Sequence, residues 1–371
     1  NIKTTYMKKL NTPIRIFVGL LFIFSGLIKA NDPHGLSYKM QEFFEVWGFD
    51  FLNPLSLFSS LGMNVLEVFA GIAIIVNWQT KKITWLLFML ILFFTFLTGY
   101  ALFSGKIKTC GCFGDCLPLT PAMSFTKDII LGVLIVILLA TNSGKANKGI
   151  FGKIVLYTVT LGTAAFQWYV LSYLPIVDCL PFKKGNDIVE QMKVPVGAVP
   201  DSTSIEFIYT KNNKEVRFDQ ANFPIDFDST YVYVDRKDKV VRKGNGLVAK
   251  IVDFNLTTKS GTDTTAALFS NSKQYVLVFA KEMNGAESWK NEFQTIYNKL
   301  QAQNIDVILV TPEAERAAAI FGSINIVTSD ATVIKTAARV IPTYFLMQHA
   351  VIKEKVAAPS IDKLFTTINS K

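Results

Sequence analysis

The chain has few charged residues, few histidines and few cysteines. Among its 371 residues only 18% are charged, two are histidine and four are cysteine, whereas 50% are hydrophobic. The mean hydropathy of +0.32 is too high for an ordinary soluble protein of this size. Residues 1–180 hold nearly all the long apolar runs, and residues 183–371 are typical of a water-soluble region. The composition therefore indicates a membrane half and a soluble half.

The pattern of charge excludes nucleic acid as a partner. The formal net charge at pH 7 is +9, and nucleic-acid-binding surfaces are also basic. However, the lysines mostly flank apolar runs or are mixed with acidic residues, and no segment interleaves basic and aromatic side chains. The lipid bilayer is the partner that the composition predicts.

The apolar runs predict five transmembrane helices. Each run is close to the ~20 residues that a bilayer requires. No small-x-small cleavage site follows the first run, so we expect a retained helix rather than a signal peptide. The runs comprise residues 14–28, 57–78, 83–103, 125–140 and 150–174.

A shorter amphipathic helix is expected between the first two runs. Leu36, Met40, Phe43, Phe44 and Trp47 recur at helical spacing, with polar residues between them. Such a helix either lies on the membrane surface or packs against the bundle. Packing is the interpretation that we prefer.

The basic residues predict the orientation of the helices. Cytoplasmic loops of membrane proteins carry an excess of lysine and arginine. With a cytoplasmic N-terminus, the inner segments hold Lys3, Lys8, Lys9, Arg15, Lys81, Lys82, Lys145, Lys148 and Lys153. The outer loops then hold fewer lysines, diluted by acidic residues. We therefore expect the C-terminal half and all four cysteines on the outer side, where disulfides persist.

The soluble half divides into two parts by its pattern. A small β-rich spacer is expected over residues 181–250, with two hairpins. Residues 251–371 alternate strands and helices, and a βαβ unit followed by a hairpin and a helix predicts an α/β domain with a covered sheet. The expected hairpins turn at Lys211-Asn212-Asn213, at Arg236-Lys237-Asp238 and at His349-Ala350. The predicted domains are thus 1–180, 181–250 and 251–371.

The cysteines are gathered around one loop between the third and fourth runs. Cys110, Cys112 and Cys116 lie in this loop, and Cys179 follows the fifth run. Such a concentration indicates thiol exchange, structural disulfides or a metal site, and spacing does not choose among the three pairings. Four or five extended residues span roughly 13–18 Å. We therefore predict that Cys179 reaches disulfide range of Cys110 or Cys116.

A metal site is the weakest of these interpretations. The spacing Cys-x-Cys-x3-Cys is not a usual zinc-ligand spacing, and both histidines, His34 and His349, lie far away in the sequence. No metal is expected. Thiol exchange is the preferred role for Cys110, Cys112, Cys116 and Cys179, with a structural staple as the alternative.

Ionisable residues within the predicted helices are candidates for a second role. Glu67 lies inside the second helix, and Lys29, Lys127 and Asp128 lie near the ends of the first and fourth. Charged groups in a membrane are costly and are usually paired or functional. We expect Glu67 to face the bundle interior, with Lys29, Lys127, Ser25 or Thr98 as its partner. A lysine near the cysteine loop would lower a thiol pKa.

Residues 1–180 resemble the DoxX/MauE-type bacterial membrane proteins. The resemblance rests on Gly19-Leu20-Leu21-Phe22-Ile23-Phe24-Ser25-Gly26-Leu27-Ile28-Lys29, on Glu67 and on Cys110-Gly111-Cys112-Phe113-Gly114. The MauE branch is associated with disulfide formation in a periplasmic partner enzyme. The resemblance implies a bacterial inner-membrane protein whose C-terminal part is periplasmic.

Residues 251–371 resemble a thioredoxin-fold domain of the TlpA kind. Asp253-Phe254-Asn255-Leu256 and Val340-Ile341-Pro342-Thr343 carry the resemblance, which implies a cis peptide bond before Pro342. The family's Cys-x-x-Cys would follow residues 275–280, where this chain has Glu282-Met283-Asn284-Gly285. Without a thiol, this domain is expected to bind or position a partner.

These patterns predict a five-helix membrane bundle, a small β-rich segment and an α/β thioredoxin-like domain. The expected function is thiol–disulfide chemistry, or redox-assisted maturation of a periplasmic partner. Electrons would pass to a membrane quinone or to another thiol protein, and Lys29, Glu67, Lys127 and Asp128 are the candidate cofactor-binding residues. The alternative is a non-enzymatic anchor of an envelope complex that uses the C-terminal domain for docking.

Overall fold

The computed structural model describes residues 2–107, 109–141, 149–200, 202–242 and 244–370. The chain forms two compact units. The first comprises Asn1–Gly185 and Asn255–Lys371, and the second comprises Asn186–Phe254. The first unit holds both the helical bundle and a five-stranded sheet with its helices. Residues 255–371, which form this sheet and its helices, are called the C-terminal domain below.

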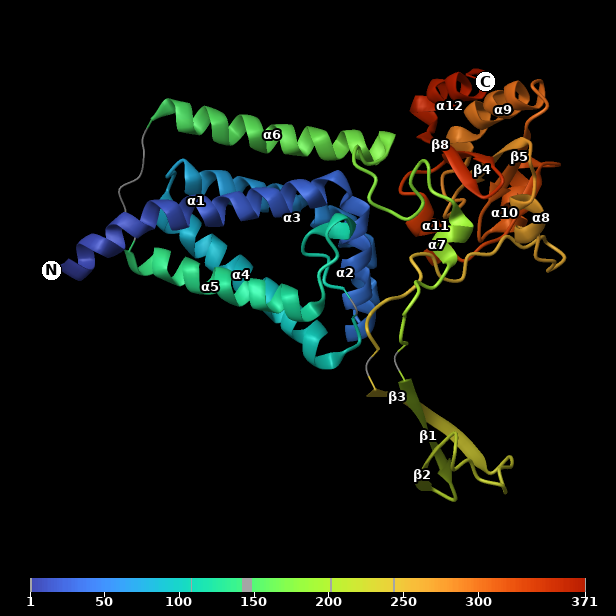
Figure 1. Cartoon of the computed structure of the whole chain (residues 1–371), viewed down its shortest axis with the longest axis horizontal. Helices are drawn as coiled ribbons and strands as arrows, with labels where there is room; N and C mark the ends of the chain where they lie inside the picture. Colours follow the sequence, from blue (N-terminus) through green and yellow to red (C-terminus); the bar gives the residue numbers. More distant parts are fainter. Residues whose placement is uncertain (1, 108, 142–148, 201, 243, 371) are drawn as a thin grey trace. The chain divides into compact units, whose positions relative to one another are not determined.

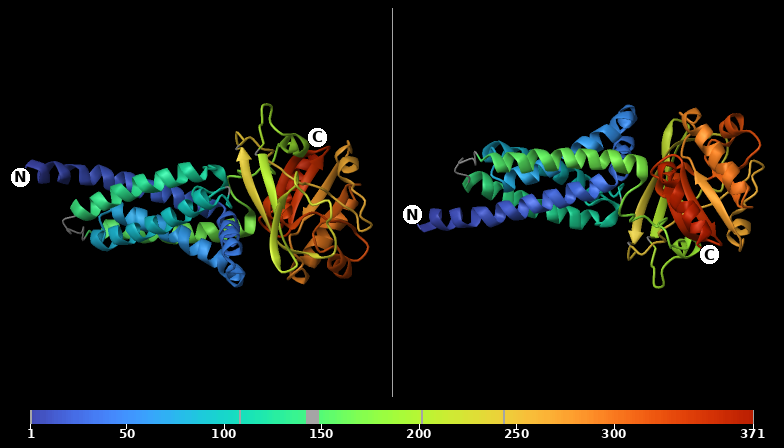
Figure 2. Two further views of the ribbon diagram at one scale, coloured as in Figure 1. Left: turned by 90° about the horizontal axis from the view of Figure 1, so that it is seen from below. Right: turned by 90° about the horizontal axis from the view of Figure 1, so that it is seen from above.

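Five helices among the described residues are long and apolar enough to cross a membrane, as predicted. They run side by side in Figures 1 and 2, and many of their large apolar side chains are exposed, as a lipid-facing surface requires. One end of the bundle, called the cysteine end, holds the end of α1, α4 and α6 and the start of α5. The helices are α1 (Ile2–Asn31), α3 (Ser56–Ile75), α4 (Thr80–Ser104), α5 (Pro121–Thr141) and α6 (Ile150–Tyr173).

Glycines bring α1 and α3 into close contact. A Cβ atom on Gly71 of α3 would lie 2.6 Å from the carbonyl oxygen of Gly19 on α1. A Cβ atom on Gly19 would in turn lie 2.7 Å from the carbonyl oxygen of Gly71. Small residues at such crossings let two backbones approach within a membrane, where packing drives helix association. These glycines therefore set the spacing of the two helices that carry Lys29 and Glu67.

The amphipathic helix predicted before the second span is α2 (Pro33–Trp47). The side chain of Asp32 caps it by accepting from the Gly35 N–H at 3.0 Å. The helix packs on α3: the Ser60 hydroxyl donates to the carbonyl of Pro33 at 2.7 Å, and the hydroxyls of Ser37 and Ser56 lie 2.8 Å apart. Packing against the bundle, rather than a separate membrane-surface helix, is therefore confirmed.

The C-terminal domain is built on a sheet with strand order β6-β5-β4-β7-β8. β4, β5 and β6 are parallel, whereas β7 and β8 form an antiparallel hairpin that turns at His349 and Ala350, as predicted. The short strand β6 was not predicted from the sequence. The strands are β4 (Gln274–Phe279), β5 (Asp306–Val310), β6 (Asn325–Val327), β7 (Thr343–Gln348) and β8 (Val351–Ala357).

The helices of this domain bury aromatic and aliphatic side chains against the sheet. Phe293 of α9 and Leu364 of α12 are fully buried in one cluster with Val278 and Leu309 from the strands. The Ile341–Pro342 peptide bond is cis, as predicted. The helices are α8 (Thr265–Phe269), α9 (Glu287–Gln301), α10 (Ala314–Phe321), α11 (Ala331–Ala337) and α12 (Ile361–Asn369), with the 3-10 turn η3 (Ala358–Ser360).

The second unit contains a three-stranded antiparallel sheet of order β2-β1-β3 and the short helix α7 (Ile188–Met192). The predicted hairpin between β1 (Ser202–Lys211) and β2 (Lys214–Asp219) is confirmed. The second predicted hairpin is wrong, because β3 runs unbroken over Tyr231–Arg242. β3 stays paired with β1 across residues 236–238, where a turn was predicted, and Lys237 lies opposite Glu206. Backbone pairing therefore continues where the charged side chains suggested a loop.

The close contact between α1 and α3 predicts the effect of one substitution. Gly71→Ala should destabilise the bundle by about 1–3 kcal/mol, because its Cβ meets backbone atoms that cannot move aside cheaply. Gly132→Ala on α5 is the matched control, since a Cβ there meets nothing within 4 Å. The control should be neutral or stabilising, because alanine favours helix over glycine by about 1 kcal/mol. Thermal unfolding in detergent measures both. Equal stability of the two variants would contradict this packing.

Candidate redox site

Cys116 and Cys179 form a disulfide at the cysteine end of the bundle. Their Cα atoms lie 4.9 Å apart although 63 positions separate them in the chain. Cys116 ends the 3-10 turn η2 (Gly114–Cys116), and Cys179 follows α6. The prediction that Cys179 lies within disulfide range of Cys110 or Cys116 is therefore confirmed for Cys116.

The segment that carries Cys179 is fixed to the end of α1. The side-chain amide of Asn31 donates to the carbonyl of Val177 at 2.8 Å, and its oxygen accepts from the Val177 N–H at 3.1 Å. Two hydrogen bonds from one side chain hold the backbone two residues before the cysteine. The loop with Cys116 and the segment with Cys179 therefore meet beside α1.

Cys110 and Cys112 are free thiols, called the cavity pair below. Gly111 separates them and has a φ of +67°, a conformation that glycine adopts without strain. The Ser25 hydroxyl of α1 donates to the carbonyl of Cys112 at 3.0 Å. The ring of Phe113 meets that of Phe24 edge-on, with centroids 5.6 Å apart. These contacts hold the cysteine loop against α1.

Burial dominates the acidity of the cavity pair. Burial, together with the neighbouring Cys112, raises the pKa of Cys110 to about 11. Burial also raises the pKa of Cys112, although the positive charges of Lys127 and Lys29 oppose that change. The two lysines thus act on the pKa of Cys112 in the expected direction, but the net pKa is raised because loss of hydration outweighs their attraction. Both thiols are protonated at neutral pH.

Cys110 and Cys112 line a cavity of about 310 Å³ at the cysteine end. Three cationic side chains reach it, those of Lys29, Lys39 and Lys127. Most of the remaining wall is apolar, which is typical of small-molecule sites with a few placed polar groups. Its aromatic residues come from α2 and α4 and are Phe43, Phe44, Trp47, Phe93 and Phe94.

The four ionisable candidates of the membrane helices form two pairs behind this wall. Lys29 and Glu67 form an ion pair in which 4% and 0% of the side chains are exposed. Lys29 also lies over the ring of Phe94, 5.2 Å from its centroid. The Nζ of Lys127 lies 2.5 Å from the Oδ1 of Asp128. The Thr98 hydroxyl donates to the Oδ2 of Asp128 at 3.0 Å. The lysines line the cavity, while the carboxylates lie behind them.

The predicted environment of Glu67 is confirmed. Its side chain is fully buried and its partner is Lys29, the first of the expected partners. Among the described residues, its second carboxylate oxygen, Oε2, accepts no hydrogen bond. Glu67 therefore depends on Lys29 for the stability of its charge.

Residues 7–143 match the family described as Methylamine utilisation protein MauE. The chain carries a MauE-family domain at its N-terminus. This domain includes Cys110, Cys112 and Cys116 together with Lys29, Glu67, Lys127 and Asp128, whereas Cys179 lies beyond the match. The MauE part of the predicted resemblance is therefore confirmed, and its DoxX and thioredoxin-like parts stay predictions.

Other comparisons cover less of the chain. Protein TlpB of Flavobacterium psychrophilum is 28% identical over 170 residues, which is 44% of this chain and 44% of that protein. The chain therefore matches less than half the length of this curated relative. Residues 203–243 match a domain of unknown function (DUF8463). No solved structure matches the chain.

Metal binding receives no support from the geometry of the MauE-family domain or the rest of the described chain. No three His, Cys, Asp or Glu side chains are placed there to hold an ion. Two of the four cysteines already bond to each other, and the two histidines lie in α2 and in the β7–β8 turn.

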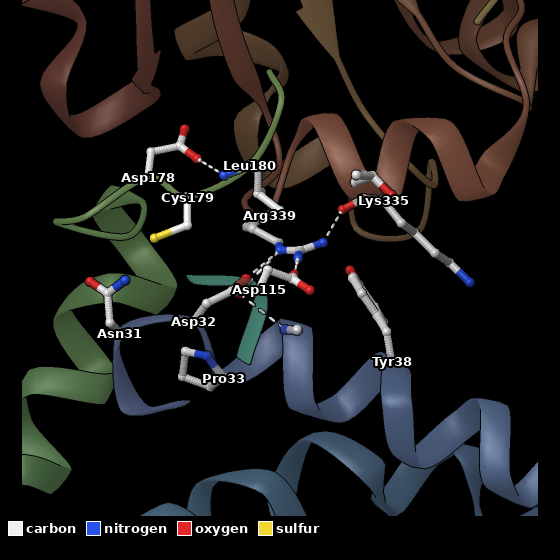
Figure 3. Close-up of polar contacts among 12 residues, drawn as sticks. Asn31, Asp32, Pro33, Tyr38, Asp115, Asp178, Cys179, Leu180, Lys335 and Arg339 are labelled. Carbon is white, nitrogen blue, oxygen red and sulfur yellow. Dashed lines mark hydrogen bonds and ion pairs between the residues drawn. The ribbon is translucent and has the colours of Figure 1, made fainter. Parts of the chain in front are cut away.

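Sequence reasoning missed the residues that join the C-terminal domain to the cysteine end of the bundle. Arg339 lies between Asp32 and Asp115 in Figure 3, and Lys355 pairs with Asp178. Arg339 follows Asp32 by 307 positions and Asp115 by 224. No pattern in the sequence links residues at such separations, so only the tertiary structure brings them together.

The buried ion pair of Lys29 and Glu67 predicts that the effects of substituting its two residues on the free energy of unfolding do not add. Glu67→Leu should destabilise the bundle by about 3–5 kcal/mol, because it leaves Lys29 buried without its carboxylate. Adding Lys29→Met should recover most of that loss, since the two apolar side chains pack without a charge. Unfolding of the single and double variants in detergent measures the coupling. Purely additive losses would show that the two side chains do not depend on each other.

Proposed function

We propose that this chain is a membrane thiol–disulfide oxidoreductase that works with two cysteine pairs. The single observation that supports this best is the state of the four cysteines. One pair, Cys116 and Cys179, is joined as a disulfide, while Cys110 and Cys112 stay as thiols that line a membrane cavity a few residues away. A structural staple alone requires no second pair of thiols at a cavity.

The proposed reaction is a sequence of two exchanges. A partner dithiol attacks the Cys116–Cys179 disulfide, and a mixed disulfide is resolved so that the partner leaves oxidised and both cysteines are thiols. These thiols then reduce the disulfide that an electron acceptor has formed between Cys110 and Cys112, which returns the cavity pair to thiols. The cavity pair is reoxidised by an acceptor that takes two electrons and two protons.

A lipid-soluble quinone is the proposed acceptor. Reduction of a quinone to a quinol consumes two electrons and two protons, and the oxidation of two protonated thiols to a disulfide releases the same number. The apolar, aromatic wall suits a quinone ring, and Lys29 and Lys127 are the cations that could donate to its carbonyl oxygens. Because burial keeps both thiols protonated, an acceptor of protons as well as electrons fits this site.

The proposed location is a bacterial inner membrane with the cysteine end in the periplasm. The five apolar helices support the membrane assignment, and the excess of lysine in the opposite loops supports the orientation. Disulfides persist in that compartment. The exchange partner would then be a periplasmic protein.

The C-terminal domain is proposed to have a thioredoxin-like fold that binds rather than exchanges. The proposal is supported by the sheet, in which three parallel strands, β6, β5 and β4, are joined to the antiparallel β7–β8 hairpin. No cysteine follows β4, since residues 280–286 are Ala-Lys-Glu-Met-Asn-Gly-Ala. Thiol chemistry is therefore confined to the cysteine end of the bundle.

The competing function is that of a non-enzymatic membrane anchor. The ion pairs between Arg339, Asp32 and Asp115, and the Cys116–Cys179 disulfide beside them, would then serve only to hold the C-terminal domain for docking to an envelope complex. In that case the cavity pair would not respond to an oxidant.

The orientation predicts the result of a fusion experiment. A reporter that is active only in the periplasm, joined after Lys371, should be active, because five spans place the two ends of the chain on opposite sides. The same reporter inserted in the loop between α5 and α6 should be silent and serves as the control. A silent fusion at Lys371 would place the cysteines in a reducing compartment and defeat the redox proposal.

A turnover assay separates the oxidoreductase from the anchor. The purified chain in lipid nanodiscs, given a reduced dithiol peptide and a soluble quinone analogue, should form quinol. Cys112→Ala should reduce this rate at least about 100-fold, because no disulfide can form in the cavity pair. Arg316→Gln, which alters an exposed ion pair with Glu313 in the C-terminal domain, should leave the rate unchanged. Quinol formation that is equally fast without Cys112 would favour the anchor.

A further inference from the structure

Arg339 of the C-terminal domain binds two carboxylates of the MauE-family domain. Its Nε donates to the Oδ2 of Asp32 at 2.8 Å, and its Nη2 donates to the Oδ2 of Asp115 at 2.7 Å. Its Nη1 donates to the carbonyl of Lys335 at 2.7 Å, which fixes the guanidinium on its own domain (Figure 3). Only 5% of the arginine side chain is exposed, so its charge is held almost entirely by these partners.

The residues that receive these cations adjoin the two half-cystines. Asp115 immediately precedes Cys116, and Asp178 immediately precedes Cys179. The Nζ of Lys355 lies 2.7 Å from the Oδ2 of Asp178, with 4% of the lysine side chain exposed. Each half of the disulfide is therefore flanked by an acidic residue that a buried cation of the C-terminal domain holds.

Both cysteine segments are attached to α1, and the segment with Cys179 is attached to the C-terminal domain as well. The residues on either side of Cys179 contact the C-terminal domain, because Lys355 pairs with Asp178 and the Gly185 N–H donates to the carbonyl of Ile352 in β8 at 2.7 Å. Cys116 lies on the loop that packs on α1 and lines the cavity with its other cysteines. The disulfide and the Arg339–Asp115 ion pair are thus two parallel links between the C-terminal domain and this loop.

We infer that Arg339 is a positioning residue that couples docking of the C-terminal domain to the redox state of Cys116 and Cys179. Two links in parallel stabilise each other, because each holds the loop where the other can form. The coupling is reciprocal, so docking favours the disulfide and the disulfide favours docking. The inference deepens the proposed function by naming what sets the redox poise of the pair that faces the partner.

The direction of the effect follows from this geometry. When a dithiol reduces Cys116–Cys179, the S–S bond gives two thiols, the reductant becomes a disulfide, and the ion pair with Arg339 remains as the link between the loop and the C-terminal domain. Without Arg339, the reduced loop moves away from Cys179 more freely, so the effective concentration of one thiol at the other falls. Loss of Arg339 should therefore make the disulfide easier to reduce.

A redox titration of the full chain tests this coupling. Cys110→Ala and Cys112→Ala form the background, so that only Cys116 and Cys179 titrate, and mixtures of reduced and oxidised dithiothreitol set the potential. The fraction of thiols is read by maleimide labelling on a gel. Arg339→Gln should lower the equilibrium constant for disulfide formation about tenfold, within the range usual for coupled sites. Arg339→Lys should give an intermediate value, because one ammonium cannot bond both carboxylates in the same fixed geometry.

Further variants keep the test valid if a buried arginine cannot be removed without unfolding. Asp115→Asn removes the same ion pair from the more exposed partner, whose side chain is 43% exposed, and should shift the equilibrium in the same direction. Arg316→Gln is the matched control, because its ion pair lies within the C-terminal domain. A constant within twofold of the parent for both Arg339→Gln and Asp115→Asn would overturn the coupling.

Hydrogen exchange supplies the reciprocal measurement. Reduction of Cys116–Cys179 should increase exchange in α11, which precedes Arg339, while α9 in the same domain should be unaffected. Unchanged exchange in α11 would contradict the inference. Neither measurement needs turnover. If no quinol forms but Arg339→Gln still shifts the redox equilibrium of Cys116 and Cys179, the proposed function fails and the coupling stands.

Discussion

The disulfide between Cys116 and Cys179 is the connection on which the cysteine end depends. It joins a loop of the helical bundle to the segment that enters the C-terminal domain, across 63 positions of sequence. Around it, Asn31 fixes one segment to α1 and Arg339 fixes the other to the C-terminal domain. Each of these contacts is modest alone, but a covalent bond between the two segments lets all of them form together.

The cavity beside this disulfide shows how burial and charge compete. Lys29 and Lys127 lie close enough to favour ionisation of Cys112, yet the thiol stays protonated because it is removed from water. The lysines are themselves engaged by Glu67 and Asp128. A carboxylate behind each lysine reduces the positive charge that the cavity presents. In the proposed reaction the cavity pair would therefore give up protons together with electrons, which matches the proposed quinone acceptor.

Some local patterns predicted the structure because short-range physics decides them. The apolar runs had to become helices, since an unpaired backbone cannot cross a bilayer. The turn at Asn212 and Asn213 has positive φ at both residues, which asparagine tolerates. At residues 236–238 the same reasoning failed, because β3 is paired with β1 there as well. Arg236 and Lys237 are exposed to solvent, so their charges do not prevent a strand at these positions. Sequence propensity is weak where the side chains stay in water.

The sequence by itself determined the five spans, the α/β pattern of residues 274–369 and the small set of cysteines that can do chemistry. It also limited the partners of Glu67 to a few polar groups, because a charge in a membrane needs a partner. Only the tertiary structure decided that Cys116 rather than Cys110 bonds to Cys179, and that Arg339 lies between Asp32 and Asp115. These choices depend on which chain segments meet after folding. Several partners of equal local chemistry were available, and the packing of α1, α6 and the C-terminal domain selected among them.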